Sequence, residues 1–335
     1  MNFQQLKIVR ETVRRSFNLT DVSAALFTSQ SGVSKHIKLL EEELGVELFV
    51  RRGKRLIGLT EPGKEVVAIV ERMLADANSI QAIGDEFAAR DVGRLTIATT
   101  HTQARYALPS VVAAFKREFA KVDLVLHETS PSEIVAMLRE GHADIGIATE
   151  ALAGVEDFAV FPWYTWHHAV VVPRTHPLAR AREASRNQES RNQESRNQDS
   201  RNRESRNRKK ARKLTLADIA SQPLITYRDG FTGRASIDRA FAAAGLAPNV
   251  VMAALDADVI KTYVETGLGI GIIASMAFVA ARDTELTLLD ANDLFDGNTT
   301  VIAVPRGRFL RRYAFRFIAL CAPDVSEAVV RERVG

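Results

Sequence analysis

The sequence predicts an α/β protein built from an N-terminal winged helix-turn-helix, a long linker helix and a two-lobed domain. Three observations support this prediction. Two short amphipathic helices meet at a tight turn between residues 19 and 40, and a basic hairpin follows them. An apolar seven-residue repeat then runs from residue 63 to about residue 90 without a strong helix breaker. After residue 91 strands and helices alternate, which is typical of a mainly parallel sheet covered by helices on both faces.

The first stretch has the features of an element that reads DNA. Apolar residues at helical spacing give each helix an inward face, and the hydroxyls of Thr28 and Ser29 can cap the second helix. Its outward face carries short hydrogen-bonding groups near the start and cations further along, which suit base edges and phosphates. We predict a helix-turn-helix from Leu19 to Lys38, in which the DNA-contacting side chains are Ser29, Gln30, Ser31, Ser34, Lys35 and Lys38. The alternative is a pair of ordinary amphipathic helices.

A basic hairpin follows directly. Residues 48–50 and 56–59 have strand patterns, and the turn between them places four cations around Gly53. A hairpin at this position suits a wing that contacts the DNA backbone beside the groove. The predicted wing cations are Arg51, Arg52, Lys54 and Arg55, and residues 1–60 form the predicted DNA-binding domain.

Residues 61–91 are expected to form the linker and dimerisation helix. Two positions of the seven-residue repeat are apolar or small: Val66, Met73, Ile80 and Phe87 at one, and Val70, Ala77 and Gly84 at the other. Such a stripe predicts pairing with a second copy of the chain, and a dimer would present two recognition helices to two half-sites. The alternative is a helix that packs on its own domain.

Residues 92–325 are expected to form two α/β lobes. The first lobe takes residues 92–163 and 268–325, and the second takes residues 164–267, with the crossovers near residues 163–166 and 267. Ligands of open α/β sheets bind at the carboxyl ends of strands, so the cleft between the lobes is the expected binding site.

A five-residue repeat interrupts the second lobe. The sequence SRNQE recurs with small changes between residues 185 and 208 and contains no apolar residue, so it cannot contribute to a core. We expect a tolerated, disordered surface-loop insertion at about residues 182–213, because the entropic cost of closing a loop grows slowly with its length. Contact of its arginines with DNA is the alternative.

Charge is unevenly distributed along the chain. The formal net charge is +4, but residues 1–60 carry +4 and residues 179–213 carry +8, so the remainder carries −8. The basic character is therefore local. This distribution suits a small DNA-binding head on an acidic body that has a different task.

Several classes of function lack the residues they need. The single cysteine, Cys321, excludes an internal disulfide framework and a cysteine-rich zinc site. Adjacent His167 and His168 would point to opposite faces of a strand, so they cannot share a metal. The glycine run at residues 267–271 follows a helical pattern rather than a strand, unlike a dinucleotide loop. No apolar run reaches the roughly 20 residues of a membrane span. We expect a soluble cytoplasmic protein that is not an enzyme and has no cofactor or metal.

The densest polar cluster runs from Thr99 to Tyr106, at a strand's carboxyl end and a helix's start. Hydroxyls and free backbone N–H groups there can hold an anion without a full positive charge. Thr149 ends another strand, and residues 231–234 open another helix. Together these ends would suit a small carboxylate, sulfate or acylated amino acid. The alternative is that the threonines only cap helices.

Between residues 24 and 41 the chain resembles the winged helix-turn-helix of LysR-type transcriptional regulators. The resemblance is carried by the paired alanines at 24–25 and by three further pairs, Ser29-Gln30, Ser34-Lys35 and Leu40-Glu41. The pair Ser31-Gly32 departs from the proline that the family commonly has in this region. The resemblance implies promoter double-stranded DNA as a partner.

The body is similar to the cysteine-regulon (CysB/Cbl) branch of that family. The similar segments are TTHTQARYALP, ADIGIATEAL, GFTGR and DADVIKTYV, followed by GLGIGIIASMA, and the similarity covers residues 1 to about 325 except for the repeat. It implies a periplasmic-binding-protein-like effector domain that responds to N-acetylserine, O-acetylserine, sulfate or thiosulfate. The implied effector-binding residues are Thr100, Thr102, Gln103, Thr149 and Thr232, with Trp166 at the lobe crossover as a further candidate.

The resemblance also implies a biological role. The implied role is to regulate genes of sulfur assimilation and cysteine biosynthesis. Such a regulator works as a dimer of dimers and contacts RNA polymerase. A regulator of another sulfur-source pathway, such as sulfonate use, is the nearer alternative. A small-molecule-binding α/β enzyme with an N-terminal dimerisation segment is the more distant one.

Overall fold

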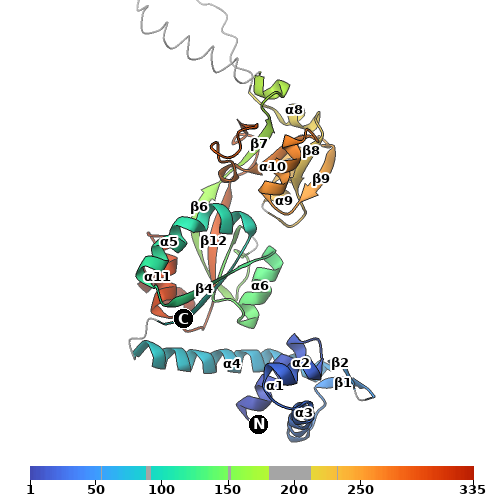
Figure 1. The fold of residues 1–335 in the computed structure, drawn as a ribbon, viewed down its shortest axis with the longest axis vertical. Coiled ribbons are helices and arrows are strands. Elements are labelled where there is room, and N and C mark those ends of the chain that lie inside the picture. The colour runs from blue at the N-terminus through green and yellow to red at the C-terminus, as the bar shows by residue number, and fades with distance from the viewer. Residues whose placement is uncertain (54, 88–91, 150–151, 181–212, 232) are drawn as a thin grey trace, which may run out of the picture.

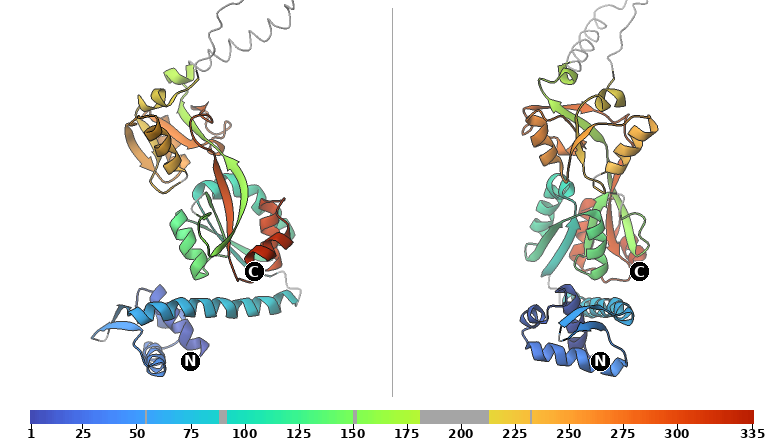
Figure 2. Two further views of the ribbon diagram at one scale, coloured as in Figure 1. Left: turned by 180° about the vertical axis from the view of Figure 1, so that it is seen from behind. Right: turned by 90° about the vertical axis from the view of Figure 1, so that its right-hand side faces the viewer.

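The computed structural model describes residues 1–53, 55–87, 92–149, 152–180, 213–231 and 233–335. These form an elongated molecule, in which helix α4 (Glu61–Phe87) separates a small N-terminal head from two α/β lobes stacked along the long axis (Figure 1). The views from behind and from the side show the same order (Figure 2). No helix of these residues is long and apolar enough to cross a membrane.

The head contains three helices and one antiparallel hairpin. Its elements are α1 (Phe3–Arg14), α2 (Leu19–Ala25), α3 (Gln30–Leu44), β1 (Phe49–Arg52) and β2 (Arg55–Leu59). Ser29 caps α3 as predicted, because its side chain accepts a hydrogen bond from the backbone N of Gly32 at 3.0 Å. Gly45 ends α3 in the left-handed region, with φ 71°. The inward faces of the helices and the hairpin share one apolar core.

Some apolar residues of helix α4 pack against the head, and others are exposed to solvent. Val70 and Leu74 are buried together with Leu6 of α1, and Met73 packs against them. Ile80, further along, is 72% exposed. The first half of the predicted stripe therefore packs on the chain's own head, as the alternative interpretation held, and Ile80 remains open to a partner.

The first lobe is a five-stranded sheet in the order β4-β3-β5-β12-β6. Its strands are β3 (Gly93–Thr99), β4 (Val122–Glu128), β5 (Ile145–Thr149), β6 (Phe158–Trp166) and β12 (Asn298–Pro305). The helical segments are η1 (Gln103–Ala107), α5 (Leu108–Glu118), α6 (Pro131–Glu140), α11 (Arg312–Cys321) and α12 (Glu327–Val334). Strand β3 is parallel to β4 and β5, whereas β12 is antiparallel to β5 and β6.

The second lobe repeats this plan in the order β11-β7-β10-β8-β9. Its strands are β7 (His168–Pro173), β8 (Leu224–Tyr227), β9 (Val250–Ala254), β10 (Ile270–Ala274) and β11 (Leu286–Asp290). Its helical segments include α8 (Leu216–Ala220), α9 (Arg234–Ala243), α10 (Ala257–Glu265) and η2 (Ser275–Ala277). The predicted parallel pairing holds for β8 with β9 and β10, while β7 runs antiparallel to β10 and β11.

Two crossovers join the lobes, and the sequence located only one of them. The outgoing crossover lies at His167, between β6 and β7, close to the predicted position. The return was predicted near residue 267, but β10 and β11 belong to the second lobe's sheet, so the chain returns between β11 and β12. An apolar run such as residues 270–274 fits the centre of either sheet. Its sequence pattern therefore does not show which of the two lobes contains the strand. The repeat insertion lies almost wholly outside the described residues.

Candidate functional site

The first wall of the inter-lobe site is the turn between β3 and η1. Thr100 and Thr102 are buried here, and Gln103 is 1% exposed. The backbone carbonyl of Thr100 accepts hydrogen bonds from the backbone N of Gln103 at 3.0 Å and of Ala104 at 3.1 Å. This turn directs the Gln103 side chain away from solvent and towards the crossover strands.

Gln103 belongs to a hydrogen-bonded polar group inside the protein. Its Nε2 donates to Thr300 Oγ1 of β12 at 3.2 Å, and its Oε1 accepts from the Tyr164 hydroxyl of β6. Trp166 Nε1 donates to the same Thr300 Oγ1, also at 3.2 Å. Thr149 of β5 lies beside Thr300 in the strand ladder. Burial raises the pKa of Tyr164 to about 12, so these side chains form an uncharged group of donors and acceptors.

The second wall contains buried polar atoms without partners. His168 Nδ1 of β7 lies 3.4 Å from Asn298 Nδ2 of β12, and a Cβ at Gly233 would lie only 2.7 Å from His168 and 2.8 Å from Asn298 Oδ1. Asn298 Oδ1 and Ser236 Oγ are buried and lack a hydrogen-bond partner in the described protein. Such atoms commonly mark where a water or a ligand belongs. Thr232, which was predicted to bind the effector, lies outside the described residues.

The structure therefore brings Gln103, Thr149 and Trp166 together around Thr300, with Thr100 and Thr102 on the adjoining turn. A cavity of about 460 Å³ lies at the crossover, and Trp166 is the predicted residue that lines it, beside Tyr164 and Met276. The sequence prediction missed Tyr164, Thr300 and Asn298. Their signal was a polar side chain within an otherwise apolar crossover strand, but the contact partners are far away in sequence.

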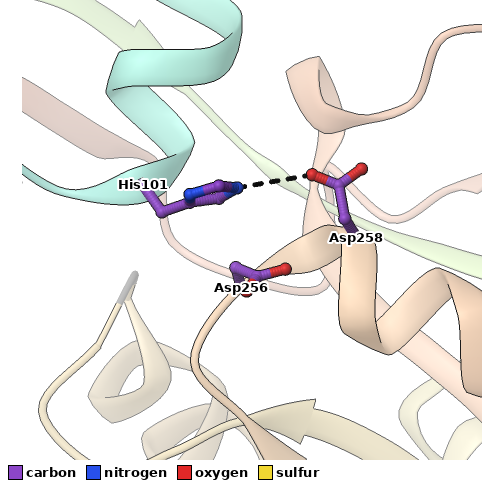
Figure 3. A group of neighbouring side chains, drawn as sticks. All are labelled: His101, Asp256 and Asp258. Atoms are coloured by element: carbon purple, nitrogen blue, oxygen red, sulfur yellow. Dashed lines mark ion pairs between the residues drawn. The ribbon is translucent and has the colours of Figure 1, made fainter. Parts of the chain in front are cut away.

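A second polar group joins the lobes at the edge of the cleft. His101 of the first lobe faces Asp256 and Asp258 of the second (Figure 3), and His101 Nε2 lies 3.5 Å from Asp258 Oδ2. Tyr106 OH donates to Asp258 Oδ1 at 2.7 Å, and Arg105 Nε lies 2.8 Å from Asp258 Oδ2. We call His101, Arg105, Tyr106 and Asp258 the inter-lobe clasp.

The clasp suits an ion-pair network better than a metal site. Donor atoms of His101, Asp256 and Asp258 lie within 4.8 Å of one another, which is compatible with a cation. However, Lys261 Nζ lies 3.3 Å from Asp258, and Arg105 adds a second positive charge. Burial by itself would raise the pKa of Asp258, but the hydrogen bond from Tyr106 and the cations Lys261 and Arg105 outweigh it and lower that pKa. The Asp258 charge is thus already balanced.

The predicted DNA-reading face of α3 is open to solvent. Gln30, Ser31, Lys35 and Lys38 are exposed, and Ser34 is half-buried. Lys38 lies 3.5 Å from Glu42, an exposed pair that competes weakly with a phosphate.

The wing is tied to this helix by Glu41. Its buried carboxylate accepts hydrogen bonds from the backbone N of Leu48 at 2.9 Å and of Phe49 at 3.2 Å, and from Arg51 Nη2 at 2.7 Å. Arg51 therefore orients the wing as well as adding charge. Arg52 and Arg55 are exposed and face each other across the hairpin, whereas Lys54 lies outside the described residues.

Phe27 is a feature that the sequence prediction passed over. It is 97% exposed in the turn before α3 and has φ 49°, which is uncommon for a bulky residue. An aromatic ring held in solvent beside the recognition helix adds an apolar contact to this surface.

Comparisons with known protein families agree with this architecture. Residues 3–64 match the family model described as "Bacterial regulatory helix-turn-helix protein, lysR family". Residues 88–193 and 205–325 match the model of the LysR substrate binding domain, and the gap between them falls within the repeat. These matches confirm the predicted winged head and the two-lobed domain.

Curated relatives match nearly the whole chain. The transcriptional regulator SsuR of Burkholderia cenocepacia is 51% identical over 330 residues, covering 98% of this chain and 97% of the relative. The regulator Cbl of Escherichia coli is 46% identical, with coverage of 100% and 96%, and CysB of Burkholderia cenocepacia is 44% identical, with coverage of 99% and 96%.

Solved structures show the same folds. The cofactor-binding domain of the Cbl transcriptional regulator is 43% identical with a TM-score of 0.61, covering 72% of this chain and 93% of that one. Full-length CbnR complexed with its target DNA has a TM-score of 0.60 at 19% identity, with coverage of 96% and 99%, and supports the fold alone.

Proposed function

The chain belongs to the LysR family of bacterial transcriptional regulators, and from that premise we propose that it controls genes of sulfur assimilation or cysteine biosynthesis. The support is its similarity, at 44–51% identity over nearly its full length, to the regulators SsuR, Cbl and CysB. Identity is higher to SsuR and Cbl than to CysB, which favours control of another sulfur-source pathway, such as sulfonate use, as a second candidate.

The proposed effector is a small anion bound between the lobes, namely N-acetylserine, O-acetylserine, sulfate or thiosulfate. We assign its contacts to Thr100, Thr102, Gln103, Thr149, Thr232 and Trp166. The observation that carries this proposal is the buried, uncharged group around Thr300, together with the unpartnered hydroxyl of Ser236, which can donate a hydrogen bond. Neutral N–H and O–H donors can hold an anion in such a place without burying a permanent charge.

The proposed mechanism couples this site to DNA. An effector shifts the protein between two arrangements only if it binds one of them more tightly. Because the clasp spans the cleft through Tyr106 and Asp258, closure of the lobes around the anion changes contacts on both sides. In a dimer of dimers on promoter DNA, that shift alters the spacing of the heads, and with it DNA bending and contact with RNA polymerase.

Calorimetric titration tests the effector assignment. The purified full chain is titrated with N-acetylserine, O-acetylserine, sulfate and thiosulfate, and the titrations are repeated on Thr100→Ala. We expect one compound to bind and the substitution to weaken it by about tenfold, as for one lost hydrogen bond to a charged ligand. Thr266→Ala, an exposed threonine at the end of α10, is the matched control. If none of the four compounds binds to protein that still binds DNA, the assignment to sulfur metabolism is contradicted.

Charge reversal separates this function from that of a ligand-binding enzyme. Lys35→Glu combined with Arg52→Glu places two negative charges on the exposed face of the head, where a regulator would meet phosphates. We expect DNA binding to be lost and calorimetric effector binding to be unchanged. Unaltered DNA affinity would count against the assigned DNA surface.

A further inference from the structure

A second polar cavity lies at the junction between the head, helix α4 and the first lobe. Its volume is about 360 Å³. Figure 2 shows α4 lying across the base of the first lobe with the head beside it. The lining comes from all three parts: Arg10 and Arg14 from α1, Glu71 from α4, and Asp144 and Arg308 from the loops of the first lobe. No predicted effector residue lines this cavity.

The lining carries an excess of positive charge. Five arginines meet three carboxylates there, namely Arg10, Arg14, Arg94, Arg308 and Arg311 against Glu71, Glu140 and Asp144. Part of this charge is already paired. Arg14 Nη2 lies 3.2 Å from Glu71 and donates to the Glu140 carbonyl at 3.1 Å, and outside the lining Arg10 Nε lies 3.5 Å from Glu11 and Arg94 Nε lies 2.8 Å from Asp123. The Nε atoms of Arg10 and Arg14 are buried and have no hydrogen-bond partner in the described protein. The guanidinium groups of Arg10 and Arg14 are therefore only partly satisfied.

The environment of the charged groups favours an added anion. Burial lowers the pKa of Arg308 and outweighs the opposing effect of Asp144, so a further negative charge beside it would stabilise its protonated form. An anion that meets the guanidinium groups directly would supply the missing charge and the missing hydrogen-bond acceptors.

We propose that this junction cavity binds a small tetrahedral dianion, phosphate or sulfate, either free or carried on a small metabolite. Guanidinium groups match the oxygens of such anions through paired N–H donors. The walls come from the head, the linker helix and the first lobe. The anion therefore binds only when these three parts are arranged as they are in this structure. Its binding therefore holds the head against the body, and it is linked to DNA binding whatever occupies the cleft.

The test is calorimetric titration of the full chain with inorganic phosphate, inorganic sulfate and glycerol phosphate. The variants are Arg10→Gln and Arg308→Gln, with Arg139→Gln as a control, because Arg139 pairs with Asp157 outside the cavity. We expect at least one anion to bind, and each cavity variant to weaken it about tenfold or more while the control does not. Stronger binding of glycerol phosphate than of inorganic phosphate assigns the site to a metabolite, and the reverse order assigns it to the free ion.

Two further results decide the proposal. Thr100→Ala changes the cleft and should leave phosphate binding at the junction intact. A failure of the cleft assignment can therefore be told apart from a failure of the junction proposal. Arg10 is partly exposed and lies in the head rather than the first lobe, so Arg10→Gln keeps the test valid if Arg308→Gln does not fold. Absence of binding by all three anions, phosphate binding that survives both cavity variants, or equal loss in Arg139→Gln overturns the proposal.

Discussion

At the scale of single residues, Glu41 shows how one buried carboxylate organises the DNA-binding head. It lies on the inward face of α3 and accepts two backbone N–H groups from the start of the wing together with Arg51. The recognition helix and the wing are therefore held in one orientation. The sequence prediction placed Arg51 on the wing but did not foresee its partner, which lies ten residues earlier.

Replacing Glu41 should destabilise the head. Glu41→Ala leaves the backbone N–H groups of Leu48 and Phe49 without their acceptor in a buried place, at a cost of about 2–4 kcal/mol in the free energy of unfolding. Glu42→Ala is the control and should cost less than about 0.5 kcal/mol, because Glu42 is exposed. Urea unfolding followed by circular dichroism measures both. Equal effects of the two substitutions would contradict this role.

Residue-level prediction succeeded where the cause was local. Ser29 could be assigned as a cap because a hydroxyl just before a helix satisfies that helix's own N–H groups. Tyr164 and Thr300 could not be assigned, because each acquires its role from partners more than 60 residues away. Gln103 and Trp166 were found through family resemblance, and the structure adds the shared contact with Thr300 that joins them.

At the scale of elements, α4 serves two surfaces at once. Val70 and Leu74 anchor it to α1, while Ile69, Ile80 and Ile83 are exposed. The seven-residue pattern predicted the helix correctly because its period is a property of the helix itself. It could not show which part of the stripe the head would cover. The position of the return crossover escaped prediction for a similar reason, since it depends on which sheet accepts a strand.

The exposed isoleucines of α4 predict a dimer surface. Ile80→Asp places a charge in the proposed contact, so we expect the dimer to dissociate into monomers at concentrations where the unmodified chain is associated. Lys64→Gln, an exposed change near the start of the same helix and on a different face from these isoleucines, should have no effect. Sedimentation velocity distinguishes the species. A dimer of Ile80→Asp as stable as the original would place the interface elsewhere.

At the scale of the whole molecule, a basic head and two polar sites are arranged along one axis. The crossover cavity adjoins both lobes, and the junction cavity lies between the first lobe and the head. Figure 1 shows the order of the parts, with α3 of the head on the far side of α4 from the lobes. In the proposed mechanism, a signal that starts in the cleft would pass the junction before it reaches DNA. This order makes the junction a natural place for a second input.

The SRNQE repeat should be dispensable to this arrangement. Deletion of residues 185–208 removes no apolar residue, and the family model itself passes over residues 194–204. We expect the melting temperature, the DNA affinity and effector binding to remain unchanged, since shortening the predicted loop changes its closure entropy only slightly. Differential scanning calorimetry and gel shifts provide the comparison. A clear loss of DNA affinity at low salt would instead support contact between the repeat arginines and phosphates.

The central claim is that an anion in the cleft changes how the heads engage DNA. The most direct measurement is a nuclease footprint of the full chain on a promoter fragment that it binds, with and without N-acetylserine, O-acetylserine, sulfate or thiosulfate. The account predicts that one of these compounds changes the footprint of the unmodified protein and leaves that of Thr100→Ala unchanged. Footprints of the unmodified protein that are identical in all five conditions would contradict it.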